Sequence, residues 1–358
     1  MNIVEIARKF SVSPVTVSNA LNYRKGVAEA LARQIRDYAG SIGYQPNYLA
    51  RSLLSGRTGT IGVCLCVPPA TPWFCNLLSQ LQHRLAEENY YANTIIINPF
   101  ESGDRLQREK WALNFFRQIK TEAILFGPLD VERFSLLRRE LTALPRLVVF
   151  DALETLPVPH VGLDMSGSCE MAMQYLFQAG HRQIGYLGLN HFDATSPSPY
   201  TRYARYRDFL ARHGLPFQPD WVIHTPRLLP EPTMLADLKR LLLRPDRVSA
   251  FFCHDDSFAM LAFKAAAECG RRIPEDLALI SFDNQPSAWL ANPGLSSIYF
   301  DLDDYIDHLL EITLELLNAS PDSPPPLRQH RATAKLAERE SIIPLAESQF
   351  DQKFSIGS

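Results

Sequence analysis

The sequence has no apolar run long enough to cross a bilayer. A spanning helix needs about 18 to 20 such residues, whereas the run from Ile61 to Val67 has only the length of a strand. No opening segment combines a basic start, an apolar stretch and a small-residue cleavage site, so we expect a cytoplasmic protein rather than a secreted one.

Cysteine is sparse, and its six positions predict neither disulfides nor a metal site. Cys64 and Cys66 would share one face of a strand, but no second Cys/His pair at metal-ligand spacing accompanies them. The other four cysteines, at positions 75, 169, 253 and 269, are scattered. We expect buried thiols in a reducing compartment.

The common signatures of catalysis and phosphate binding are also missing. There is no GxSxG, no Walker-type loop and no GxGxxG after the first predicted strand. The run His254-Asp255-Asp256 invites an enzymatic or metal-binding interpretation, but no spacing identifies the further ligands that a metal needs. We therefore expect no enzyme activity and no cofactor.

Charge is distributed unevenly along the chain. The 358 residues carry a formal net charge of −3. Residues 1–60 hold eight Lys/Arg against three Asp/Glu, a net of +5, so the rest of the chain carries −8. A basic head on an acidic body predicts an anionic partner for the head alone.

The first 46 residues predict an all-α domain of three short helices. The first runs from Asn2 to Phe10, the second starts at Pro14 and the third spans about Ala28 to Ile42. Ser13 is a suitable N-cap, and Pro14 suits the first helical position, which needs no amide donor. In the second helix an apolar face (Val17, Ala20, Leu21) opposes a small, uncharged one (Val15, Thr16, Ser18, Asn19, Asn22). The first two helices are typical of a helix-turn-helix, although such pairs also occur in helical proteins that bind no DNA.

Residues 47–58 are predicted to link this headpiece to the body. The run Tyr48 to Leu54 favours a helix, but so short a helix is marginal in water unless something else orders it. A flexible linker that happens to favour helix is the alternative interpretation.

From Thr60 the chain alternates apolar strand-like runs with helical patterns, which is typical of βαβ units around parallel sheets. Two doubly wound lobes fit the length, and we place them at 59–163 with 301–327 and at 164–300 with 328–344, with a frayed tail over 345–358. A last strand is expected near 328–336. Open α/β sheets bind ligands at the carboxyl ends of their strands, so we expect a small-molecule site between the lobes.

Seven motifs occur in an order and spacing that resemble the lactose/galactose repressor family of bacterial transcription regulators. The sequence segments are VSPVTVSNALN, GYQPNYLARSL, AGHRQIGYLG, RYARYRDFL, CHDDSFAMLA, IPEDLALISFDN and GLSSIYF, with TIGV opening the first lobe and LAERES near the end. The resemblance covers Asn2 to about Pro344. It implies a helix-turn-helix headpiece and a core with the fold of periplasmic sugar-binding proteins.

The resemblance also implies which residues contact DNA. Phosphate contacts are implied for Ser13, Thr16, Ser18 and Asn22, and base-edge contacts for Pro14, Val15 and Asn19. Leu53 matches the residue that wedges between central base pairs in the minor groove, where Ala50 and Arg51 gain contacts. Asn2, Tyr44 and Asn47 complete the implied DNA-contacting set.

Two positions depart from the common family pattern. Asn19 stands where family members usually have Arg, and Asn favours adenine whereas Arg favours guanine. We therefore predict an operator unlike that of the lactose repressor, with a phosphate or water contact as the alternative role of Asn19. Ser11 replaces the usual turn Gly, which is unexpected if the backbone there needs a positive φ.

The resemblance places effector ligands between the lobes. The implied residues are Asp151, Arg202, Asp255 and Asp283, with Trp73, Phe74 and Phe300 as aromatic surfaces. Trp73 and Phe74 are expected in the loop after the first strand. Carboxylates accept hydrogen bonds from vicinal hydroxyls, and Arg donates to oxygens, so a sugar is expected. Arg205, one turn after Arg202, raises the alternative of a sugar phosphate or sugar acid.

These observations predict a homodimeric transcription regulator, most simply a repressor, that binds a pseudo-palindromic operator under the control of a small-molecule effector. The alternative is a sugar-binding or sugar-modifying protein in which the first 58 residues form an accessory domain.

Overall fold

The computed structural model describes residues 3–21, 26–44, 57–67, 72–99, 101–144, 146–189, 201–227, 229–245, 248–320 and 326–345. Contacts divide the chain into two units, Met1–Gly59 and Thr60–Ser358, and each is described by itself. Among the described residues, no helix is both long and apolar enough to span a membrane.

The described residues of the first unit form three helices around a small core. They are α1 (Ile3–Lys9), α2 (Pro14–Leu21) and α3 (Glu29–Ser41). The buried residues of this core recur at helical spacing: Ile6, Ala7, Val17, Ala20, Ala32, Ile35 and Ala39. The predicted headpiece helices are therefore confirmed, to within one or two residues at their ends.

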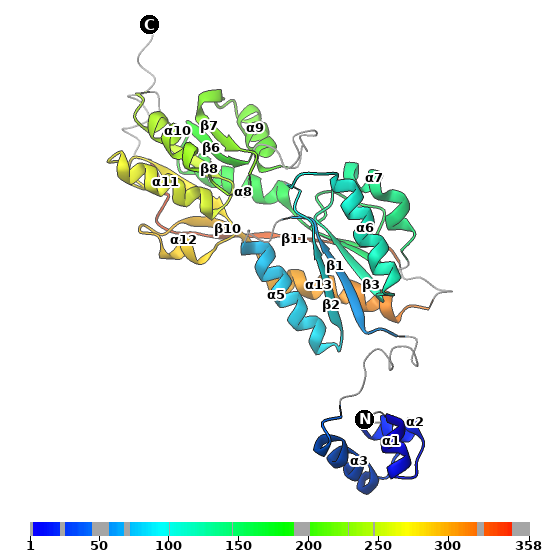
Figure 1. The fold of residues 1–358 in the computed structure, drawn as a ribbon. Coiled ribbons are helices and arrows are strands. Elements are labelled where there is room, and N and C mark those ends of the chain that lie inside the picture. The colour runs from blue at the N-terminus through cyan, green and yellow to red at the C-terminus, as the bar shows by residue number, and fades with distance from the viewer. Residues whose placement is uncertain are drawn as a thin grey trace. The chain divides into compact units, whose positions relative to one another are not determined.

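The second unit holds two six-stranded sheets with helices on both faces (Figure 1). The first sheet has the order β11-β5-β4-β3-β1-β2, and the described pairs within it are parallel. Its strands are β1 (Thr60–Leu65), β2 (Tyr91–Ile96), β3 (Ala123–Gly127), β4 (Leu147–Phe150), β5 (His160–Leu163) and β11 (Gln329–Ala332).

Four helices cover the first sheet: α5 (Pro72–Glu87), α6 (Arg105–Gln118), α7 (Val131–Thr142) and α13 (Leu302–Asn318). Helices α5 and α13 share one apolar core with one face of the sheet, and α6 and α7 share another with the opposite face. Both faces of the central strands are buried, which explains their continuous rather than alternating apolar sequence.

The second sheet has the order β12-β10-β9-β8-β6-β7. Its strands are β6 (Ile184–Leu189), β7 (Val222–Thr225), β8 (Ala250–Cys253), β9 (Ala278–Phe282), β10 (Ser296–Phe300) and β12 (Ala334–Ala337). Only the edge pair β10–β12 is antiparallel. Helices α8 (Met165–Gln178) and α9 (Arg202–Arg212) pack on one face, and α10 (Pro232–Leu242), α11 (Asp256–Glu268) and α12 (Pro286–Leu290) pack on the other.

The chain passes between the sheets at three places. The third, between β11 and β12, shows that the strand predicted near 328–336 is wrong. The single last strand expected near 328–336 is two strands, β11 in the first sheet and β12 in the second, separated by Thr333. Residues 329–332 therefore belong to the first lobe rather than to the second. Continuous β propensity does not show where a strand leaves one sheet and enters another.

Four of the six cysteines are buried, and all six are free thiols. Cys64 and Cys66 lie on the same side of the chain, with 3.9 Å between their sulfur atoms. Cys75 is exposed and Cys269 half-buried, so the expectation of buried thiols is wrong for these two.

Candidate functional site

Helix α2 presents the polar face that the sequence predicts. Ser13, Pro14 and Val15 are exposed, whereas Val17 and Ala20 point into the core. The Ser13 hydroxyl accepts a hydrogen bond from the backbone N–H of Thr16 at 3.1 Å, which caps the helix. Thr16, Ser18 and Asn19 are half-buried on the same helix.

The turn before α2 has the positive φ that the family's Gly would favour. Ser11 takes φ 50° there, in the left-handed region that a non-glycine residue adopts at some cost. The backbone N–H of Val12 donates to the carbonyl of Ala7 at 3.0 Å, which closes the turn. The position therefore does need a positive φ, and Ser11 adopts it in place of the usual Gly.

Arg36 has a structural role that the sequence did not predict. Its guanidinium donates to the carbonyl of Ala20 at 3.0 Å and to the Glu29 carboxylate at 2.6 Å. It thus satisfies a carbonyl at the end of α2 and fixes the orientation of this helix against α3.

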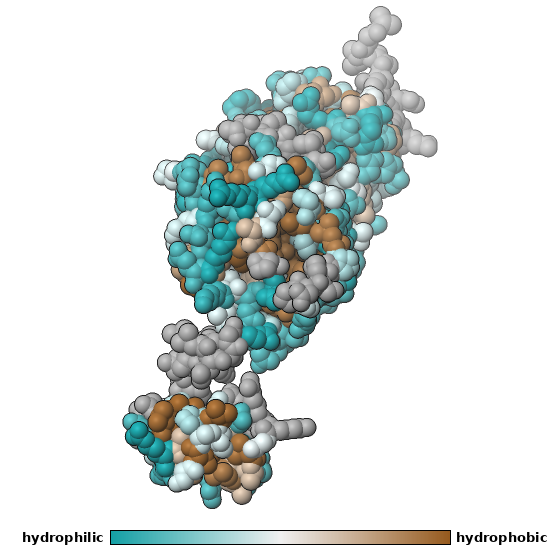
Figure 2. Space-filling view, turned by 90° about the vertical axis from the view of Figure 1, so that its right-hand side faces the viewer, coloured by the Kyte–Doolittle hydropathy of each residue, from teal (hydrophilic) through white to brown (hydrophobic). Residues whose placement is uncertain are grey.

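The headpiece carries apolar atoms at its surface (Figure 2), and Val4 and Val15 are its large exposed hydrophobic side chains among the described residues. Tyr44 is half-buried, and burial raises the pKa of its hydroxyl. The predicted DNA contacts Asn2, Asn22, Asn47, Ala50, Arg51 and Leu53 lie outside the described residues, as does the predicted hinge helix.

In the second unit, four of the predicted effector residues form one charged cluster. Asp151 follows β4, Asp255 follows β8, Asp283 follows β9, and Arg202 is the first residue of α9. The carboxyl ends of parallel strands therefore bring residues together that are up to 132 positions apart in the chain. Arg202 Nη2 lies 3.7 Å from Asp283 Oδ1.

Burial shifts the pKa values of the three carboxyl groups in this cluster upward. Burial and the neighbouring Asp283 raise the pKa of Asp255 to about 7, against the opposing effect of Arg202. Burial raises the pKa of Asp151 to about 6, and burial also raises that of Asp283. The Arg202 guanidinium therefore faces two buried carboxyl groups, Asp151 and Asp255, and the half-buried Asp283, which leaves hydrogen-bonding capacity for another molecule.

One N–H donor of the Arg202 guanidinium has no acceptor among the described residues. Its Nε is buried without a hydrogen-bond partner among the described residues. Its Nη1 lies 3.2 Å from His254 Nε2, and its guanidinium lies 4.3 Å from the centre of the Phe282 ring. Burial and Arg202 lower the pKa of His254 well below its usual value, so this imidazole is neutral and can accept from Arg202.

An aromatic group lies next to Asp151. The Trp73 ring meets Phe300 and Tyr305 edge-on, with centroid distances of 6.4 and 5.9 Å. The backbone N–H of Asp151 donates to the Tyr305 hydroxyl at 2.6 Å, which connects this group to the charged cluster. Trp73 Nε1 is buried and has no hydrogen-bond partner within the described part of the chain.

The expected loop position of Trp73 and Phe74 is wrong. Helix α5 begins at Pro72, so both residues lie in its first turn. Phe74 continues the buried stripe of Leu77 and Leu81 and belongs to the core of the first lobe. Proline is tolerated in the first turn of a helix, and the apolar residues that follow recur at helical spacing.

The run His254-Asp255-Asp256 divides into three different roles. His254 orients Arg202, and Asp255 caps α11 by accepting from the N–H of Ser257 at 2.8 Å. Asp256 Oδ1 accepts from the hydroxyls of Ser281 and Ser297, and Oδ2 accepts from the N–H of Gln285 at 2.5 Å. Asp256 therefore fixes the ends of β9 and β10.

His254 and Tyr305 are the members of this cluster that the sequence did not predict. His254 lies next to a predicted ligand, which was the available signal. Tyr305 lies on α13, and nothing in the sequence indicates that its hydroxyl reaches Asp151.

A separate cavity of about 560 Å³ lies between α6 and α7, away from this cluster. Its lining includes Lys110, Trp111, Arg117 and Arg139, and none of the predicted effector residues.

The comparisons with known proteins agree with this architecture. Residues 173–342 match the family model of the periplasmic binding protein-like domain. The regulator of the NTD biosynthesis operon, NtdR, from Bacillus subtilis is 28% identical over 302 residues, which is 83% of this chain and 86% of the relative. The transcriptional regulator AscG from Escherichia coli is 26% identical over 95% of this chain and 98% of its own length.

Solved structures share the fold. A lac repressor dimer bound to operator and an anti-inducer superposes with a TM-score of 0.80 at 18% identity, covering 96% of this chain and 99% of the other. A complex of the transcriptional regulator CelR with cellobiose gives a TM-score of 0.63 at 20% identity, covering 95% and 99%.

The fold and the site define a chain that couples a helix-turn-helix headpiece to a two-lobed core of the periplasmic-binding-protein type. Over most of its length the chain is similar to transcription regulators of the lactose/galactose repressor type.

Proposed function

We propose that this protein is a transcriptional repressor whose affinity for operator DNA is controlled by a small molecule bound at the Arg202 cluster. The observation that carries the proposal is the buried Nε of Arg202, which has no hydrogen-bond partner among the described residues and lies beside three carboxyl groups, in a chain that also holds a helix-turn-helix unit. Protein groups with unused donors and acceptors at the ends of parallel strands favour a polar ligand.

The effector is proposed to be a sugar or a sugar derivative. Carboxylates accept from vicinal hydroxyls and a guanidinium donates to ring or acidic oxygens. The half-buried Trp73, which packs edge-on against the buried Phe300 and Tyr305, would supply the aromatic surface that covers the apolar face of a sugar ring. Solved neighbours with the same fold are complexes with cellobiose, glucose and sucrose, which supports this class of ligand.

The headpiece is proposed to bind a pseudo-palindromic operator as part of a homodimer in the cytoplasm. Ser13, Thr16 and Ser18 would contact phosphates, and Pro14, Val15 and Asn19 would face base edges. Asn2, Asn22, Tyr44 and Asn47 would add contacts, and Ala50, Arg51 and Leu53 would lie in the minor groove.

Effector binding would change the relative arrangement of the two lobes of each subunit and so favour or disfavour the paired headpieces on DNA. By linkage, the effector and the operator must change each other's affinity by the same factor.

Selection from a palindromic DNA library, followed by fluorescence anisotropy at several salt concentrations, tests the proposal. We expect sequence-selective binding that weakens steeply with salt, because phosphate contacts release counterions. A sugar panel screened by thermal shift then identifies effectors, and a true effector must change operator affinity. Absence of selective binding at every salt and effector condition would refute the proposal.

Deleting residues 1–58 separates this function from that of a sugar-binding protein with an accessory headpiece. Small-molecule binding should survive the deletion under both hypotheses. Regulation of a reporter gene should be lost only if the chain acts through DNA.

A further inference from the structure

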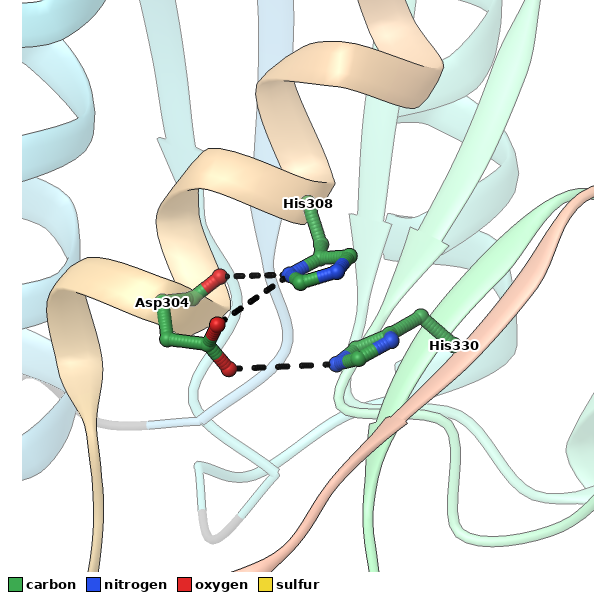
Figure 3. Close-up of side chains that lie close together, drawn as sticks. All are labelled: Asp304, His308 and His330. Carbon is green, nitrogen blue, oxygen red and sulfur yellow. Dashed lines mark hydrogen bonds and ion pairs between the residues drawn. The ribbon is translucent and has the colours of Figure 1, made fainter.

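Two histidines and an aspartate meet on the outer side of the first lobe (Figure 3). Asp304 and His308 lie on α13, and His330 lies on β11. His308 Nδ1 is 3.6 Å from Asp304 Oδ1, and His330 Nε2 is 4.0 Å from Asp304 Oδ2. One potential ligand atom from each residue lies within 4.8 Å of the others.

The fold holds these three side chains in place before any ligand arrives. Asp304 and His308 are four residues apart on one helix and therefore lie on the same face. His330 is fixed by the pairing of β11 with β5, where it lies opposite Val161. The two imidazole rings stack with their centroids 3.5 Å apart and their planes 10° apart, and both turn a nitrogen toward Asp304 (Figure 3).

We propose that Asp304, His308 and His330 form a binding site for a divalent transition metal of the zinc class, with solvent completing the coordination. Imidazole nitrogens and a carboxylate oxygen are ligands that Zn²⁺ prefers, and a site with three protein ligands leaves one position open. Ligand atoms around a tetrahedral zinc ion lie about 3.3 Å apart. Binding therefore requires the two stacked rings to tilt until their nitrogen lone pairs converge on one ion, and the half-exposed Asp304 side chain to move toward them.

The state of His330 independently favours a cation ligand. Its Nε2 is buried and forms no hydrogen bond to any described residue. His308 Nδ1 lies 2.8 Å from the Asp304 carbonyl oxygen, and metal binding replaces this hydrogen bond.

The site lies beside two of the segments that connect the lobes. Asp304 is three residues beyond Asp301, where the chain passes from β10 to α13, and His330 is three residues before Thr333, where β11 passes to β12. Lys335 Nζ already pairs with Asp301 Oδ2 across these segments at 2.9 Å. A bound metal therefore ties α13 to β11 next to both connections and stabilises the folded core by mass action.

Zinc titration of the full-length, tag-free protein after chelator treatment tests the site. Isothermal titration calorimetry should show one zinc ion per chain, and zinc should raise the melting temperature in a concentration-dependent way. His330→Gln and Asp304→Asn should each weaken zinc binding at least tenfold and remove the zinc-dependent rise in melting temperature.

Two variants serve as controls. His83→Gln removes an exposed histidine that pairs only with a carboxylate on its own helix, and Cys75→Ser removes the exposed thiol; both should bind zinc as the parent does. The Asp304 side chain is 54% exposed, so Asp304→Asn should fold with the parent's melting temperature in chelator. Absence of zinc binding to the parent, or parent-like binding by His330→Gln or Asp304→Asn, overturns the proposal.

Discussion

Arg202 Nη2 and Asp283 Oδ1 lie 3.7 Å apart, a distance that is too long for a hydrogen bond and short enough for strong attraction between largely buried charges. Both groups can therefore bind an inserted oxygen or hydroxyl without first breaking a hydrogen bond to each other. The Arg202 guanidinium stacks on the Phe282 ring and contacts His254, and both contacts keep it in position before a ligand binds.

Replacing Arg202 should abolish the effector response without abolishing DNA binding. Arg202→Gln removes a charged donor, and a hydrogen bond to a charged group contributes about 1.5–3 kcal/mol, so effector affinity should fall roughly 10- to 150-fold. Operator affinity without effector should stay within a few-fold of the parent. Arg240→Gln, at a guanidinium that is 76% exposed on α10, is the matched control. An unchanged effector titration in Arg202→Gln would exclude the site.

The stability of the core should fall as pH rises through the range set by the buried carboxyl groups. The pKa values of Asp151 and Asp255 are about 6 and 7 in the folded chain, above their unfolded values near 4. Between those limits the folded chain binds more protons than the unfolded chain, so the free energy of unfolding decreases with rising pH.

Asp255→Asn should reduce this pH dependence. Asn keeps the cap of α11 but carries no charge, so the variant should be more stable than the parent at pH 8 by about 1–3 kcal/mol and close to it at pH 4. Urea unfolding at both pH values measures the difference. Asp237→Asn, at a surface ion pair, should leave the slope as it is; an equal slope in Asp255→Asn would contradict the prediction.

Gly188 should be intolerant of a side chain because it lies against His254. A Cβ at position 188 would come within 2.2 Å of His254 Cβ and displace the imidazole that orients Arg202. Gly188→Ala should destabilise the core by about 2–4 kcal/mol, since overpacking alone typically costs about 1–3 kcal/mol, and should weaken effector binding. Gly214→Ala has open space and only an unfavourable φ of 62°, so it should cost about 1 kcal/mol and leave effector affinity intact. Melting temperatures and effector titrations of the two variants make the comparison.

Asn19 should contribute sequence selectivity rather than general affinity. Asn19→Ala should reduce discrimination at one base pair of each half-site by about 1–3 kcal/mol and leave the salt dependence of binding unchanged. Asn19→Arg should shift the preferred base toward guanine. Ser41→Ala, at an exposed hydroxyl on α3, is the control. Libraries selected with the parent and with Asn19→Ala that have the same base preferences would show that Asn19 contacts only phosphate or water.

Interactions between residues close in sequence determined where the helices begin and which of their faces are buried. Pro14 after a capping Ser13 begins α2, and the spacing of Val17 and Ala20 decides which face is buried, because capping and helical periodicity are local. The strands β8 and β9 coincide with continuous apolar runs, since strands buried on both faces require such sequence. The family resemblance placed Asp151, Arg202, Asp255 and Asp283 at the ends of such strands.

Only the tertiary structure decided how those side chains meet. It placed Tyr305 beneath Asp151, His254 beside Arg202 and His330 against His308, and it divided one apparent strand between two sheets at Thr333. These contacts join segments far apart in the chain, so they depend on strand order and on the packing of α13 and α9 rather than on local propensity. Burial then decided the charge state of the cluster, because removing water from a carboxyl group raises its pKa and no single residue type encodes that loss.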